Sequence, residues 1–182
     1  MAVALRAGYV SGEGVTAQAT ATPAAGGGPF GFGRPASAAL IASENIDVRP
    51  DGQGLPPGSG TVAQGQAVYA ATCAICHGDS GSEGGRGPVL VDSRPFVAGV
   101  VPATVGNYWP YPTTVWDYIN RAMPFDAPGS LSADEVYAVT AYLLNANGII
   151  PDDALLNAQT LPQIVMPNLP NFISPDPRPD VP

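Results

Sequence analysis

Both cysteines and the only histidine of the chain lie within five consecutive positions, as Cys73, Cys76 and His77 in the sequence CAICH. Three chemistries use paired cysteines at this spacing: a disulfide redox switch, half of a zinc site, or covalent attachment of haem. A zinc site needs four ligands, so carboxylates or a second chain would have to complete it. A redox pair usually follows a strand and begins a helix, whereas this pair closes a helical pattern. The motif therefore predicts one covalent haem c, with His77 as a metal ligand.

A methionine is the expected second ligand, because His and Met together give an electron-transfer centre of raised potential. Met123 lies in RAMPFDAPG, where Pro124 ends a helix and stiffens the loop that carries the sulfur. Met166 lies in a proline-rich tail, where an ordinary core or surface methionine is the simpler interpretation. We therefore expect His77 and Met123 to bind the metal.

Residues around these motifs are expected to shape a haem pocket. His77 needs an acceptor for its second ring N–H, and the Pro88 carbonyl in GRGPVL is the predicted one, with Leu90 as an apolar wall. Large aromatic side chains that flank the methionine loop are candidates for packing on the haem edge or for donating to a propionate: Tyr108, Trp109 and Trp116. Ordinary core packing explains any one of these aromatics about as well.

Helices must position these residues. The pattern TVAQGQAVYAATCAIC predicts a first helix from residue 61, which ends at Gly78. The pattern TTVWDYINRAMP predicts a second helix, which begins at Thr113 or Thr114 and stops before Pro124.

The third predicted helix, in SLSADEVYAVTAYLLNANG, has the strongest helical pattern in the sequence. Ser132 and Glu135 form a capping box, and Gly148 stands at the C-terminal end. The stripe expected to face inward consists of Val136, Val139, Thr140 and Leu143.

The helical unit is predicted to span residues 61–148. Residues 1–60 and 149–182 hold many Gly and Pro residues and few periodic apolar runs, so we expect an extended N-terminal arm and a proline-rich C-terminal arm. Within the first arm, PASAALIASENI predicts a short helix that begins near Pro35 or Ser37. The expected fold class is all-α, with long irregular arms on both sides.

Composition restricts the partners and the compartment. The 182-residue chain has 15 acidic and 7 basic residues and a formal net charge of −8. Nucleic acids and anionic membranes are bound through basic surfaces, so neither is an expected partner. No run of about 18 apolar residues is present, so no membrane insertion is expected. The N-terminal sequence does not look like an intact secretory signal, but covalent haem is attached outside the cytoplasm in most bacteria, and we expect a periplasmic protein.

As a set, these features resemble class I cytochrome c, and the resemblance covers most of residues 61–148. In that family the first and last helices cross, with a glycine and an aromatic residue at the contact. The matching features are the CAICH motif, the Gly-Pro pair, and the residues Gly65, Tyr69, Leu90, Met123, Pro124 and Tyr142.

A narrower resemblance extends further along the chain. FGFGRPAS, GNYWPYPTTVWDYINRAMPFDAPG and LPQIVMPN look like parts of the cytochrome subunits of bacterial sulfane dehydrogenases of the Sox system and of related sulfite dehydrogenases. This resemblance implies a tight complex, a heterotetramer in the Sox enzyme, with a subunit whose molybdenum cofactor oxidises sulfur. The haem would receive the electrons and pass them to a downstream acceptor. Many members carry a second haem domain, whereas this sequence has a single CxxCH motif.

Three functions are compatible with these features. The first is an electron-transfer subunit bound to a molybdenum dehydrogenase, with no catalysis by this chain alone. The second is a freely diffusing class I cytochrome c shuttle of a respiratory chain. The third, a haem enzyme or sensor with an open metal site, is disfavoured because the chain has no second histidine and Met123 is well placed.

The arms favour the first function. A shuttle needs no long arms, and ordering an irregular backbone costs roughly 1–2 kcal/mol per residue, which a large partner surface would offset. We expect the arms to wrap the molybdenum subunit through scattered apolar anchors. These anchors are Phe30, Phe32, Leu40, Ile41, Leu55, Leu155, Leu161, Ile164, Val165, Phe172 and Ile173.

Overall fold

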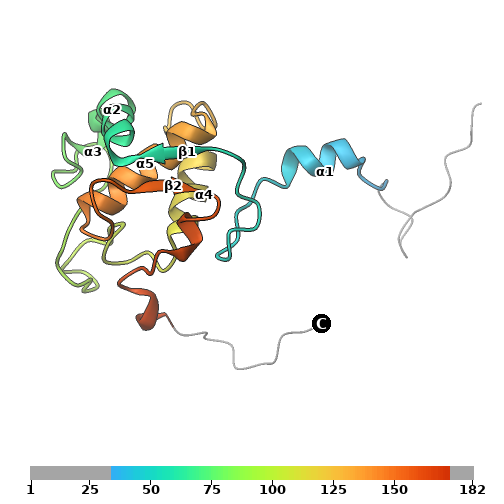
Figure 1. The fold of residues 1–182 in the computed structure, drawn as a ribbon. Coiled ribbons are helices and arrows are strands. Elements are labelled where there is room, and N and C mark those ends of the chain that lie inside the picture. Colours follow the sequence, from blue (N-terminus) through green and yellow to red (C-terminus); the bar gives the residue numbers. More distant parts are fainter. Residues whose placement is uncertain (1–33, 173–182) are drawn as a thin grey trace, which may run out of the picture. The chain divides into compact units, whose positions relative to one another are not determined.

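The computed structural model describes residues 34–172 of the chain (Figure 1). The chain divides into two compact units, residues 1–44 and 45–182. In the first unit, α1 (Ala38–Glu44) follows Ser37, whose hydroxyl oxygen accepts a backbone N–H of the first helical turn at 3.1 Å. The short helix predicted in PASAALIASENI is therefore confirmed, and Ser37 caps it.

The described part of the second unit is mainly helical. Its α-helices are α2 (Val62–Thr72), α3 (Ala74–His77), α4 (Pro112–Ala122) and α5 (Ala133–Ala146). Two three-residue strands, β1 (Ser59–Thr61) and β2 (Leu155–Asn157), pair antiparallel, and the 3-10 turns η1 (Leu161–Gln163) and η2 (Leu169–Asn171) follow. The predicted all-α class is confirmed, with this small sheet as an addition.

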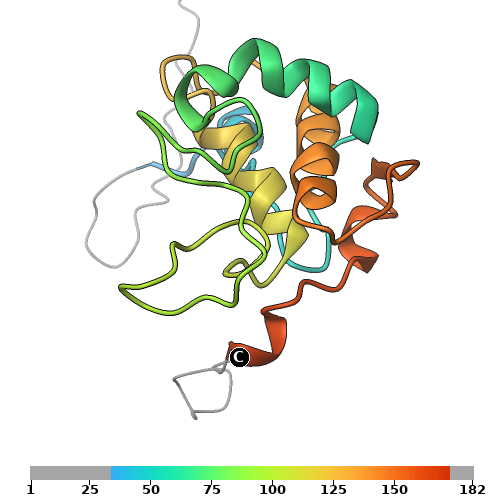
Figure 2. The same ribbon diagram turned by 90° about the vertical axis from the view of Figure 1, so that its left-hand side faces the viewer.

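α2 and α5 cross at a glycine, as the resemblance to class I cytochrome c implies. Gly65 of α2 is buried, and a Cβ atom there would lie 1.8 Å from the Ala138 carbonyl oxygen of α5. Only glycine lets the two backbones approach this closely. Beside this contact, the rings of Tyr69 and Tyr142 pack with their centroids 4.9 Å apart. Figure 2 shows α2 lying across α5.

The predicted capping box begins α5. The Ser132 hydroxyl oxygen accepts the Glu135 backbone N–H at 3.3 Å, and the Glu135 carboxylate accepts the Ser132 backbone N–H at 2.8 Å. These bonds from Ser132 lower the pKa of the Glu135 carboxyl below its ordinary value. The predicted inward stripe is confirmed, since every member is buried: Val136, Val139, Thr140 and Leu143.

α4 begins at Pro112 rather than at the predicted Thr113 or Thr114. Proline suits the first helical position, because the N–H that it lacks would have no partner there and its fixed φ matches the helix. The helix ends at Ala122, and Met123 follows as the capping residue. The predicted stop before the Met-Pro pair is confirmed.

Residues 45–60, expected in an extended arm, pack against α4 and α5. Val48 is buried in the hydrophobic core, and Leu55 packs at the edge of this core. The Tyr137 hydroxyl of α5 donates to the Pro56 carbonyl at 2.9 Å. This segment is therefore part of the second packed unit and is not a free extension of it.

Residues 149–172 also fold back onto the helices. β2 pairs with β1 so that Leu156 lies opposite Gly60. The packed unit therefore extends beyond the predicted 61–148 on both sides, because single apolar side chains fill separate gaps in the core without forming a periodic pattern. The buried side chains in this segment are Leu156, Leu161 and Met166.

Other predicted anchors of the arms are exposed to solvent or lie outside the described residues. Those that stay exposed are Leu155, Val165, Phe172 and, in α1, Leu40 and Ile41. Those outside the described residues are Phe30, Phe32 and Ile173. Among the helices of residues 34–172, none has the length and apolar character that crossing a membrane requires.

Candidate functional site

The two cysteines and the histidine form one tight turn. The Cys73 backbone N–H donates to the Tyr69 carbonyl at 2.8 Å, and α3 then continues to His77 and stops at Gly78. Gly78 has a φ of +83°, a conformation that favours glycine. The backbone N–H groups of Cys76 and His77 donate to the Cys73 carbonyl at 3.1 and 3.0 Å. Residues three and four positions apart in such a turn share a face, so the three side chains come together.

The thiols are free and half-buried, which bears on the three chemistries considered for them. Cys73 and Cys76 form no disulfide. Burial raises the pKa of the Cys73 thiol above its ordinary value, whereas a redox-active cysteine needs a lowered pKa. Within residues 34–172, no group of three or more His, Cys, Asp and Glu side chains is arranged to hold a bare metal ion. Of the three chemistries, thioether formation with haem fits this turn best.

His77 is buried, and its ring orientation is set by one hydrogen bond. Nδ1 lies 2.8 Å from the Pro88 carbonyl oxygen, which is the predicted acceptor. A carbonyl oxygen can only accept, so Nδ1 carries the proton and donates it. The lone pair of Nε2 is then available to a metal.

Gly87 lets this loop pass close to the histidine ring. A Cβ atom at Gly87 would lie 2.6 Å from Cε1 of His77 and 2.7 Å from its Nδ1. The Gly87 backbone N–H also donates to the Cys76 carbonyl at 2.8 Å, which binds the loop to the cysteine turn. The sequence analysis includes Gly87 in the Gly-Pro pair, but it does not predict this contact with the histidine ring.

The two internal methionines have different surroundings. Met166 is 0% exposed and belongs to the hydrophobic core. Met123 is half-buried at the edge of this core, directly after the last turn of α4. A ligand must reach the surface of a cofactor cavity, so Met123 is the better placed of the two sulfurs.

Several predicted site residues gather at the edge of one core cluster. Cys73, Leu90, Trp109 and Met123 are partly buried side chains that pack against this cluster, and Trp116 lies inside it. The Trp109 ring also contacts the ring of Tyr118, with centroids 5.6 Å apart.

Trp116 carries a buried donor that has no partner. The side chain is 1% exposed, its ring centroid lies 5.3 Å from that of Tyr137, and its Nε1–H meets no acceptor. Leaving a buried donor unpaired costs about 1–3 kcal/mol. Among the described residues, no other buried side-chain N or O atom lacks a partner. A propionate of a bound haem would satisfy this donor, so the residues present fit a haem group.

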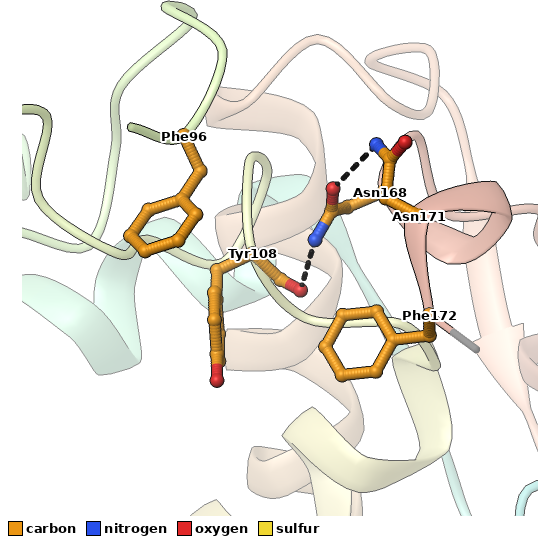
Figure 3. Close-up of a pocket in the computed structure, with 5 residues that line it drawn as sticks. All are labelled: Phe96, Tyr108, Asn168, Asn171 and Phe172. Atoms are coloured by element: carbon orange, nitrogen blue, oxygen red, sulfur yellow. Dashed lines mark hydrogen bonds between the residues drawn. The ribbon is translucent and has the colours of Figure 1, made fainter. Parts of the chain in front are cut away.

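Tyr108 is not among the side chains that pack on the core cluster with Cys73, Leu90, Trp109 and Met123. It lines an open surface cleft, where its ring contacts those of Phe96 and Phe172 at centroid distances of 5.0 and 5.7 Å (Figure 3). Asn168 Nδ2 donates to the Tyr108 backbone carbonyl at 2.7 Å and holds the wall of the cleft. The ring faces the Phe96 and Phe172 side chains in this cleft, so its contacts are accounted for without a haem.

Two large apolar side chains beside the site are strongly exposed. Ile75, between the two cysteines, is 79% exposed, and Phe125, two positions after Met123, is 85% exposed. Exposed apolar groups of this size are common at protein contacts. The sequence analysis overlooked both residues, although their positions within the CxxCH motif and next to the Met-Pro pair were visible.

Comparisons with known proteins identify relatives of this chain. A family model described as cytochrome C oxidase, cbb3-type, subunit III matches residues 60–143. The crystal structure of the sulfane dehydrogenase SoxCD from Paracoccus pantotrophus contains a chain that is 45% identical, with a TM-score of 0.73. That match covers 82% of this chain and 73% of the SoxCD chain.

A curated relative is similar over a shorter stretch. The thiosulfate dehydrogenase of Stutzerimonas stutzeri (strain A1501) is 33% identical over 90 residues, which make up 48% of this chain and 28% of the relative. The chain thus spans less than a third of the length of that relative. The cysteine turn, the crossed helices and these matches together show that the chain belongs to the class I cytochrome c family, whose cofactor is haem c, and is related to a chain of the sulfane dehydrogenase SoxCD.

Proposed function

We propose that this chain is a periplasmic cytochrome with one haem, which accepts electrons from a molybdenum-cofactor dehydrogenase of sulfane or sulfite and passes them to a downstream acceptor. The observation that carries this proposal is the 45% identity to a chain of SoxCD over 82% of the protein, combined with a single cysteine–histidine turn. The chain itself performs no catalysis in this proposal.

The cysteines, the histidine and the methionine have different roles in holding the proposed cofactor. Cys73 and Cys76 would hold haem c through two thioethers, and Nε2 of His77 and the sulfur of Met123 would bind its iron. Bound haem supplies one-electron transfer, and a His and Met pair suits this role because it raises the potential. The Pro88 carbonyl keeps His77 in the tautomer that leaves Nε2 free.

The pocket around the cofactor is built from apolar and aromatic side chains. Leu90 and Trp109 form apolar walls, since both pack at the edge of the core cluster that also contacts Cys73 and Met123. Trp116 donates its buried Nε1–H to a propionate, which satisfies the unpaired donor.

The molybdenum subunit is the proposed partner, in a heterotetramer. Exposed Ile75 and Phe125 lie beside the proposed haem ligands and would enter this contact. Because residues 45–60 and 149–172 are packed on the core, the wrapping role proposed for the arms now depends on residues 1–44 and 173–182, together with exposed anchors such as Leu40 and Ile41.

A freely diffusing shuttle is the second candidate function. The packing of both flanking segments on the helices favours it, because residues 45–172 then need no partner surface to order their irregular backbone. The two candidates differ in whether a molybdenum subunit stays bound.

Co-purification separates these two functions. When the chain is isolated from its native host by a tag, the permanent subunit should give one iron per chain with an equal amount of molybdenum in one gel-filtration peak. A matched variant that lacks residues 1–44 should keep its iron and elute without molybdenum, because the packed unit begins at residue 45. Iron without molybdenum in the full chain would favour the shuttle.

A further inference from the structure

α4 presents two faces to different parts of the molecule. Met123 follows Trp116 by about two helical turns, so both lie on the face of α4 that is proposed to meet the haem. Thr113, Asp117 and Arg121 follow one another at spacings of four residues and share a second face, about 100° away around the helix. Any rotation of α4 about its axis would therefore move both faces together.

The second face is bound to residues 45–58, the segment directly before β1, which we call the strap (Figure 1). Asp117 Oδ1 accepts the Val48 backbone N–H at 3.0 Å, and the Thr113 hydroxyl donates to the Pro50 carbonyl at 3.4 Å. Two successive turns of α4 are thus hydrogen-bonded to the strap.

Asp117 is the centre of this contact. It is 5% exposed, and its carboxylate also accepts hydrogen bonds from Nε and a terminal nitrogen of Arg121. This ion pair raises the pKa of the Arg121 guanidinium. A buried carboxylate needs such partners, because an unpaired charge in the interior is strongly unfavourable. The haem-binding role proposed above does not use Asp117, so its burial is otherwise unexplained.

The strap makes backbone contacts with itself. The Arg49 backbone N–H donates to the Gln53 carbonyl at 2.9 Å and closes a tight loop. A Cβ atom at Gly54 would lie 2.2 Å from the Asp47 carbonyl oxygen, so the backbone is closely packed within the loop.

The far end of the strap is fixed to α5. Tyr137 donates its hydroxyl to the Pro56 carbonyl at 2.9 Å, and burial raises the pKa of Tyr137 to about 12, so the donor stays protonated. The strap therefore links α4 to the helix that crosses α2.

We propose that Asp117 is a positioning residue, which fixes the rotation of α4 through the strap and thereby holds Met123 in place as an axial ligand. This inference rests on the proposed function, in which Met123 binds the metal. If the strap contact is lost, α4 gains freedom to rotate, and the methionine should leave the metal more often. The exchange of Met123 for an added ligand measures this opening directly.

The experiment is an imidazole titration of the full-length, haem-loaded ferric protein. Asp117→Ala should bind imidazole about tenfold more tightly than the parent, because the apparent affinity follows the fraction of molecules with Met123 displaced. Asp117→Asn should show a smaller increase, since its amide oxygen still accepts the Val48 N–H while the ion pair with Arg121 is lost. This graded order is expected if the Asp117 contacts with Val48 and Arg121 hold α4 in place.

The control variant is Thr61→Ala, which removes the side-chain cap of α2 and weakens the fold away from α4. Its imidazole affinity should match that of the parent. If Asp117→Ala and Asp117→Asn bind imidazole no more tightly than Thr61→Ala, the positioning role is wrong. If Asp117→Ala does not mature, the comparison of Asp117→Asn with Thr61→Ala decides the question in the same way.

If the proposed methionine ligation itself is wrong, the experiment would give a different result. The parent protein should show the near-infrared band of a sulfur-ligated ferric haem before any imidazole is added. A parent without this band would refute methionine ligation itself, whereas a parent with the band and unchanged affinities in the Asp117 variants would refute only the role of Asp117.

Discussion

Replacing Met123 with Ala should abolish the near-infrared charge-transfer band of the ferric protein and lower its reduction potential. The thioether sulfur stabilises the reduced state, so its loss favours the oxidised state. Axial ligands set haem potentials over a range of about 0.8 V, which makes a large shift the expected result. Absorption spectroscopy and a redox titration of the purified variant measure both effects.

Met166→Ala is the matched control for this substitution. Met166 is 0% exposed in the core, so its truncation should lower the free energy of unfolding by about 2–5 kcal/mol and leave the band and the potential unchanged. The reverse outcome, with the band lost in Met166→Ala and kept in Met123→Ala, would show that the ligand was assigned to the wrong methionine.

Gly65→Ala should lower the free energy of unfolding by about 3 kcal/mol or more. The new methyl carbon would lie 1.8 Å from the Ala138 carbonyl oxygen, and a backbone atom inside a helix cannot move aside as a side chain can. Alanine is otherwise a better helix former than glycine, so the loss must come from the crossing of α2 and α5. Denaturant unfolding of the variant, followed by circular dichroism, measures the change.

Gln66→Ala serves as the control, because Gln66 is exposed and lies next to Gly65 in the same helix. This variant should keep the stability of the parent within about 0.5 kcal/mol. Equal stability of the Gly65 and Gln66 variants would mean that the two helices do not cross at this glycine.

The helices and their ends could be predicted where local chemistry determines them. The capping box of Ser132 and Glu135 and the buried stripe of α5 follow from spacing alone, because the helical period places the stripe on one side. The start of α4 was misplaced because threonine was taken as the cap, although proline at the first helical position has its own preference.

The packing of the flanking segments could not be predicted from the sequence. Leu156 and Met166 are buried whereas their apolar neighbours Leu155 and Val165 are exposed, and runs this short have no helical or strand period that would show which residue faces the core. The two strands have three residues each and are paired across the whole helical unit, so no hairpin signal joins them. The structure of these segments is determined by their contacts with residues that are distant in the sequence.

The candidate site was predictable in its contiguous part. The cysteine turn and the Pro88 acceptor for His77 follow from motifs that act over a few residues. The close approach of Gly87 and the burial of Asp117 depend on where distant loops pass, and neither residue type indicates it. Tyr108 was proposed because it is one of the large aromatics that flank the methionine loop, and sequence alone does not show that its ring packs between Phe96 and Phe172.

The most direct test of the account is extraction of the purified protein with acidified acetone, followed by the pyridine haemochrome spectrum of the pellet and of the solvent. Thioethers from Cys73 and Cys76 should keep all of the haem with the protein, with one haem per chain and the spectrum of two saturated vinyl groups. The double variant with Cys73→Ser and Cys76→Ser should retain none. Haem that passes from the parent protein into the solvent, or a parent chain that matures without haem, would contradict the central claim.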